Sequence, residues 1–199
     1  MLVVGPENQR ITLPPELSGQ FDLGFTKYRT YSLFLIVVGT LIAILLWLAD
    51  THHLGPAPGD PDRPVFLKWL FFLSNSAHAD LRQIFYPHQY APTDAHAGHK
   101  EIISARMNRH FALLDAAAAR HPRLFAAATP LGVYTVTLTR WAALYPDQGP
   151  RWFDLAAFPA LTALARAQEA RVETPVIARA EGLGPHPFTR PEQPNPPEG

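Results

Sequence analysis

The chain has 199 residues, no net formal charge, no cysteine and 21 prolines, and only 17% of its residues are charged. A neutral chain is a poor match for nucleic acid, because that binding depends on a basic surface. A chain without cysteine has no disulfides, no thiolate nucleophile and no cysteine-ligated metal centre. The length allows one domain with appendages. The low charge indicates that apolar residues are concentrated in part of the chain.

The first concentration of apolar residues follows a polar N-terminal arm over residues 1–29. No charged residue occurs from Thr30 to Ala49, and these 20 positions would form a helix of about 30 Å, the thickness of the bilayer's hydrocarbon core. We therefore predict a transmembrane helix over residues 30–50, with the lipid bilayer as a partner. The alternatives are a buried helix of a soluble core and a cleaved signal peptide. However, the run has no polar face, and no small-x-small cleavage site follows it.

The residues of this helix that we expect to contact lipid or a partner are Leu33, Ile36, Gly39 and Trp47. A small residue such as Gly39 lets a second helix approach, and tryptophan favours the membrane interface. The run contains no histidine and no charged side chain, so we expect no haem, no other cofactor and no ion relay within it.

The charges that flank the run predict its orientation. Lys27 and Arg29 precede it, whereas Asp50, Asp60 and Asp62 follow it with no basic residue before Arg63. The positive-inside rule then places the N-terminus in the cytoplasm and the rest of the chain on the opposite side of the membrane.

The rest of the chain divides by composition. Residues 51–64 are expected to be a stiff linker without regular structure, since four prolines and two glycines occur between Leu54 and Pro64. Residues 185–199 contain six prolines and predict an extended or disordered tail. Residues 65–184 between them show helical periodicity, which predicts an all-α bundle of about five helices and an all-α fold class for the chain.

The expected helices of the bundle cover residues 65–85, 94–120, 130 onward, 159–171 and a short stretch after Pro175. Spacings of three and four residues predict one buried stripe on the second helix. Its members are Ile103, Met107, Phe111, Leu114 and Ala118. Leu131, Tyr134, Leu138 and Trp141 form the predicted inner face of the third.

Four local patterns within residues 65–184 resemble the C-terminal all-helical domain of bacterial glutathione S-transferases. They occur in the family's order: Lys68 to Ser76 with Leu81 to Pro87, Phe111 to Asp115, Thr129 and Tyr134 leading to Arg140-Trp141, and Phe158 to Leu161 continuing to Ala180-Glu181-Gly182-Leu183. The resemblance implies a helical bundle of that type and a surface that, in the family, packs against a thioredoxin-like domain.

The chain departs from the family in two ways. The third helix of the family begins with a Ser or Thr cap and carries an Asp three residues later, which closes a capping box. Here Thr129 keeps the cap, but Gly132 stands at the position of the aspartate. In addition, the thioredoxin-like domain that holds glutathione and supplies the catalytic residue has no counterpart, so the resemblance implies no transferase activity.

Two groups of polar residues are candidates for other sites. Asp94, His96, His99 and Glu101 have a spacing that can place metal ligands on one helix face, but a solvated first helical turn accounts for them equally well. His78 and Asp80 lie close enough in the sequence for acid–base chemistry, but no third member of such a site is visible. We therefore predict no catalytic, cofactor or metal residues.

These observations favour a non-catalytic, single-pass accessory subunit that docks onto and stabilises a larger membrane protein complex, of the respiratory or photosynthetic kind. The helical domain would lie on the periplasmic side of a bacterial inner membrane. Its expected docking residues are Trp69, Phe71 and Phe72 in the apolar segment VFLKWLFFL. The alternatives are a membrane-tethered protein that binds a small hydrophobic or glutathione-like ligand, and a transient assembly factor.

Overall fold

The computed structural model describes residues 2–4, 10–12, 39–146 and 151–195, and the chain divides into two compact units at Thr40 and Leu41. In the first unit, strands β1 (Leu2–Val4) and β2 (Arg10–Thr12) pair antiparallel with Val3 opposite Ile11. Each strand has three residues, which is too short to leave a periodic signal in the sequence.

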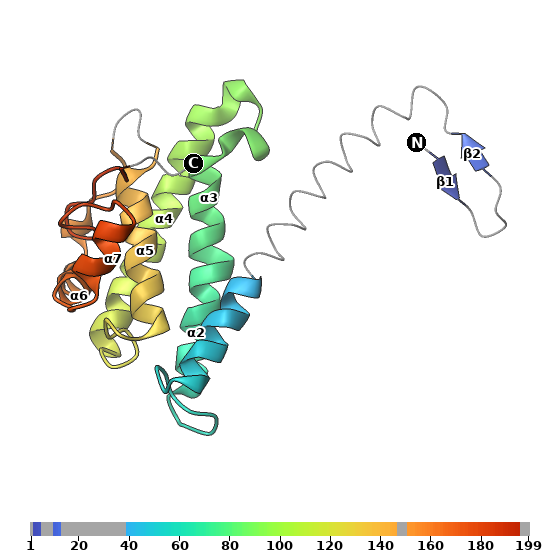
Figure 1. The fold of residues 1–199 in the computed structure, drawn as a ribbon. Coiled ribbons are helices and arrows are strands. Elements are labelled where there is room, and N and C mark those ends of the chain that lie inside the picture. The colour runs from blue at the N-terminus through green and yellow to red at the C-terminus, as the bar shows by residue number, and fades with distance from the viewer. Residues whose placement is uncertain (1, 5–9, 13–38, 147–150, 196–199) are drawn as a thin grey trace. The chain divides into compact units, whose positions relative to one another are not determined.

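All the regular secondary structure in the described residues of the second unit is helical, so the predicted all-α class is confirmed there. Residues 39–51 are helical, and we call them the entry helix. A turn over residues 52–62 leads to α2 (Arg63–Phe72), which continues through a π-helical segment (Leu73–His78) into α3 (Ala79–Phe85). Figure 1 shows α2 and α3 as one long helix along the edge of the bundle.

The next helix, α4 (His96–Arg120), follows two short 3-10 turns at Pro87–Gln89 and Thr93–Ala95. All five residues of its predicted apolar stripe are buried. This stripe lets α4 pack against α3 on one side and α6 on the other. The helical period of the sequence therefore predicted the buried face of α4 correctly.

The helix α5 (Pro130–Leu144) begins with the predicted cap, because Thr129 Oγ1 accepts a hydrogen bond from the Gly132 amide at 3.1 Å. A backbone carbonyl takes the role of the capping-box aspartate here. The Thr129 amide, which such an aspartate would bind, donates instead to the Ala126 carbonyl at 2.9 Å. A Cβ atom on Gly132 would lie 2.1 Å from that same oxygen. Glycine is thus required by the close approach of the preceding loop, and both amides that a capping box would satisfy have acceptors here.

The last helices are α6 (Pro159–Glu169), preceded by a 3-10 turn at Leu155–Ala157, and α7 (Thr174–Ala180). Asp115 of α4 caps α6 from a distance, since its Oδ1 accepts hydrogen bonds from the amides of Ala160 at 2.7 Å and Leu161 at 3.0 Å. A carboxylate at a helix N-terminus satisfies amides that have no intrahelical partner. Asp115 therefore attaches the N-terminus of α6 to α4 by hydrogen bonds.

The proline-rich segment after α7 folds back onto the bundle, which corrects the expected extended or disordered tail as far as Asn195. We call residues 182–195 the strap. Its ends are joined by a hydrogen bond from the Asn195 amide to the Gly182 carbonyl at 3.0 Å. Pro187 and Pro194 are buried, and Phe188 packs against the core. Prolines set the path of this segment, and side chains from the helices hold it, as described below.

Candidate functional site

The entry helix has two different faces. Ile42 and Ala49 are buried in the core of the bundle, with 5% and 1% of their surface exposed, and Leu41, Leu45 and Leu46 pack beside them. Ile44 and Trp47 point outward, with 49% and 62% exposed. The C-terminal part of the predicted transmembrane run is therefore a helix of the bundle whose outer face is also apolar.

The turn after the entry helix ties it to the start of α2. The Arg63 guanidinium bonds both carboxylate oxygens of Asp50, at 2.5 and 3.0 Å, and also donates to the Pro56 carbonyl at 2.7 Å. A Cβ atom on Gly55 would lie 3.2 Å from the Phe66 ring and 3.5 Å from the Ala49 side chain. Of the linker expected over residues 51–64, residues 54–62 are irregular but held against α2 by these contacts. Thr51 instead ends the entry helix, and Arg63 and Pro64 begin α2.

The residues predicted to mediate interactions fall into three groups. Leu33 and Ile36 lie outside the described residues. Gly39, Trp47 and Phe71 are exposed, Phe71 with 46% of its surface. Trp69 and Phe72 pack within the bundle instead, where their rings meet edge to face at 5.4 Å.

The environment of Trp69 and Phe72 explains their burial. Trp69 also contacts Phe125 of the loop after α4 at 6.2 Å, and Phe72 contacts His110 of α4 at 5.2 Å between ring centroids. Edge-to-face contacts of this kind add to the free energy of burial. Of the predicted aromatic group on α2, Phe71 alone faces outward.

Asp80 has partners that the sequence did not reveal. Its carboxylate accepts hydrogen bonds from Arg106 at 2.6 Å, from His110 at 2.8 Å and from Gln83 at 3.0 Å. Burial raises the pKa of Asp80, but the His110 and Arg106 contacts outweigh it and leave the pKa below its ordinary value. The carboxylate thus joins α3 to α4, because Arg106 and His110 belong to α4 and lie 26 and 30 residues further along the chain.

His78 points to a different helix from Asp80. Its Nδ1 lies 2.8 Å from the Tyr134 hydroxyl of α5, and its ring lies 5.5 Å from that of Trp141. Burial, aided by the charge of Arg82, lowers the pKa of His78 to about 4, and burial raises the pKa of Tyr134. Because His78 and Asp80 diverge, they do not form the acid–base pair considered from their spacing.

In the group formed by Asp94, His96, His99 and Glu101, the two histidines have different partners. His96 Nε2 lies 3.1 Å from the Ala91 carbonyl, and the His99 ring stacks on Tyr90 at 6.3 Å. Among the described residues, no three side chains of the His, Asp or Glu type converge as metal ligands would.

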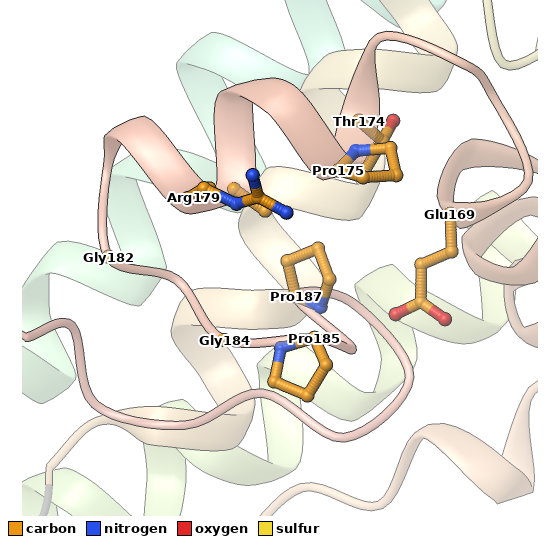
Figure 2. Close-up of a pocket in the computed structure, with 9 residues that line it drawn as sticks. Glu169, Thr174, Pro175, Arg179, Gly182, Gly184, Pro185 and Pro187 are labelled. Atoms are coloured by element: carbon orange, nitrogen blue, oxygen red, sulfur yellow. The ribbon is translucent and has the colours of Figure 1, made fainter.

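Two hollows border the strap. One of about 450 Å³ lies between α7 and the strap (Figure 2), and one of about 700 Å³ lies between α6, the strap and the segment that contains Phe153. Glu169 lines both. Its carboxylate accepts hydrogen bonds from the amides of Phe188 at 2.9 Å and Thr189 at 2.7 Å. Burial raises the pKa of Glu169, but these bonds more than offset it and leave the pKa lowered.

A buried arginine completes the attachment of the strap. Arg140 of α5 donates hydrogen bonds to the carbonyls of Pro187 at 2.8 Å and Glu192 at 2.9 Å. Arg140 belongs to the motif that ends in Arg140-Trp141, but nothing in the sequence paired it with the chain's proline-rich end.

No described helix is both long enough and apolar enough to cross a bilayer. Comparisons with models of protein families, with curated proteins and with solved structures found no match to this chain.

Proposed function

We propose that the chain is a non-catalytic accessory subunit that attaches to a larger membrane protein complex through the apolar run over residues 30–49 and a bundle of the glutathione S-transferase C-terminal type. The observation that carries the proposal is the outer face of the entry helix. Ile44 and Trp47 leave an apolar surface directly continuous with an uncharged stretch of sequence, and exposed apolar surface of this kind marks contact with lipid or protein.

The engagement of the polar residues supports a non-catalytic role. Asp80 and Glu169 are engaged by donors within the chain, and the His78 ring nitrogen that faces Tyr134 lies within hydrogen-bond distance of its hydroxyl. These contacts join α3 to α4, α6 to the strap and the π-helical segment to α5. Their evident role is to hold the bundle together.

The test is purification from the native membrane. We expect the chain to resist extraction by alkaline carbonate and to co-migrate in a mild detergent with the subunits of one complex, identified by mass spectrometry. A chain that is released by carbonate and migrates alone contradicts the proposal. A chain that stays in the membrane but is missing from the mature complex is the transient assembly factor.

The hollow of about 700 Å³ supports a second candidate function, a tethered protein that binds a small ligand. Volumes of this size hold small molecules in other proteins, and Phe153 and Phe188 supply apolar walls. Thermal stabilisation by S-hexylglutathione that is lost in Phe153→Ala and kept in Phe71→Ala supports this alternative. Absence of stabilisation excludes that probe as a ligand of the hollow.

A further inference from the structure

The entry helix and the proposed transmembrane helix share residues. Thr30 to Thr40 are 11 residues, which as a helix measure about 16 Å, roughly half of the hydrocarbon core. A crossing of the bilayer therefore also needs residues 41–49. These are the residues that pack on the bundle through Ile42 and Ala49.

The bundle cannot follow these residues into lipid. The entry helix is tied at Asp50 to the start of α2, and α2 continues into α3 as one helix. That helix carries Lys68, Asp80 and Arg82, and charged side chains are strongly disfavoured at hydrocarbon depth. Packing on the bundle and crossing the bilayer are therefore alternative states of residues 41–49.

We propose that the entry helix is an exchangeable cover. It packs on the bundle while residues 30–49 are outside a bilayer and leaves the bundle when they cross one. The face that it uncovers, beside Phe66, then binds an apolar helix of the membrane complex. This inference rests on the proposed function, since it requires the run to cross a membrane.

The present occupant defines the helix that fits the uncovered face. Ile42 and Ala49 are seven residues apart with Leu45 and Leu46 between them, which is an i, i+3/i+4, i+7 stripe. A Cβ atom on Gly55 would lie 3.2 Å from the Phe66 ring and 3.5 Å from the Ala49 side chain, which leaves little room for a larger residue at this end. A partner helix needs the same apolar stripe and a small residue at the Phe66 end.

The test of release measures a distance within the full chain. Since the chain has no cysteine, spin labels attach only at introduced ones, placed at the exposed positions Ala43 on the entry helix and Ala112 on α4. A second pair, Ala112 and Ala167 on α6, serves as the control within the bundle. Ile36→Arg with Val38→Arg keeps the run out of the bilayer and provides the packed reference.

In nanodiscs we expect the 43–112 distance to exceed that of the charged variant by about 10 Å, because seven residues of helix separate Ala43 from Asp50 at ~1.5 Å each. The 112–167 distance should stay unchanged. An equal 43–112 distance in a chain that resists carbonate extraction overturns the exchange while leaving the proposed function intact. Release of the chain by carbonate overturns the proposed function itself.

A photo-crosslinking experiment in native membranes identifies what occupies the uncovered face. In it, the photoreactive amino acid p-benzoylphenylalanine replaces Phe66. We expect the crosslinked peptide to come from an apolar helix of a different chain with the stripe described above. A crosslink to residues 41–49 of the same chain, to a second copy or to lipid contradicts this occupant.

Discussion

The entry helix and the strap are both attached to the bundle, but by different kinds of contact. The entry helix contributes Ile42 and Ala49 to the core, with one ion pair, Arg63–Asp50, at its end. The strap is held by hydrogen bonds at its backbone, where carbonyls accept from Arg140 and amides donate to the Glu169 carboxylate. Apolar contacts can be replaced by lipid or by another apolar helix, whereas lipid supplies no partners for backbone polar groups. The entry helix is therefore suited to exchange and the strap to permanent attachment.

The largest effect is expected for Arg140, the buried arginine of α5 that holds the strap. Arg140→Met removes two charge-assisted hydrogen bonds and leaves the carbonyls of Pro187 and Glu192 without their donor. We expect the free energy of unfolding to fall by about 3 kcal/mol, measured by urea unfolding, with faster proteolysis after residue 182. Arg190→Ala, at an exposed position of the strap, is the control and should change little. A small effect of Arg140→Met on the free energy of unfolding would contradict the attachment of the strap by these hydrogen bonds.

The entry helix offers a matched pair of isoleucines. In the Ile36→Arg, Val38→Arg background, Ile42→Ala should lower the free energy of unfolding by about 2–3 kcal/mol, because it opens a cavity in the core. Ile44→Ala, on the outer face, should cost no more than about 0.5 kcal/mol. Equal effects at the two positions would show that the entry helix is not packed as described.

Two glycines with positive φ compare the strap with the turn that follows the entry helix. A Cβ atom on Gly182, in the strap with φ +64°, would lie 2.1 Å from the Asn195 carbonyl, whereas one on Gly59, in the turn before α2 with φ +90°, would meet nothing within 4 Å. We expect Gly182→Ala to cost about 2 kcal/mol and Gly59→Ala about 1 kcal/mol, the latter from backbone strain alone. Thermal unfolding of both variants measures the difference. The reverse order would contradict the strap's closure.

The smallest effect concerns pH. The folded-state pKa of Glu169 lies below the ordinary 4.5, so its carboxylate stabilises the strap at higher pH, and this stability is lost as pH falls from 4.5 through the lowered pKa. An NMR titration should show the Phe188 and Thr189 amides shifting in that range. Glu169→Gln should remove the titration at a cost of about 1 kcal/mol. Amides that do not respond would show that Glu169 does not hold them.

The sequence predicted what depends on local period and caps, and missed what depends on partners far along the chain. The stripe from Ile103 to Ala118 and the Thr129 cap follow from spacings of three to four residues. The contacts of Asp80 with Arg106 and of Arg140 with Pro187 join residues 26 and 47 positions apart, and no local pattern encodes them. The uncharged run predicts a transmembrane helix, whereas its residues Ile42 and Ala49 are buried in the core of the bundle. Apolar composition alone does not distinguish contact with lipid from contact with a protein core.

Hydrogen exchange of the full chain, measured by mass spectrometry, compares the entry helix and the strap in one experiment. Between the charged Ile36→Arg, Val38→Arg variant and the wild type in nanodiscs, we expect the exchange rates of the amides of residues 63–72 to change, because these residues lose the entry helix beside them. We expect unchanged protection at Phe188 and Thr189 in the strap. Unchanged exchange over residues 63–72, or opening of the strap on insertion, would contradict the assignment of the entry helix as the exchangeable region and the strap as the permanent one.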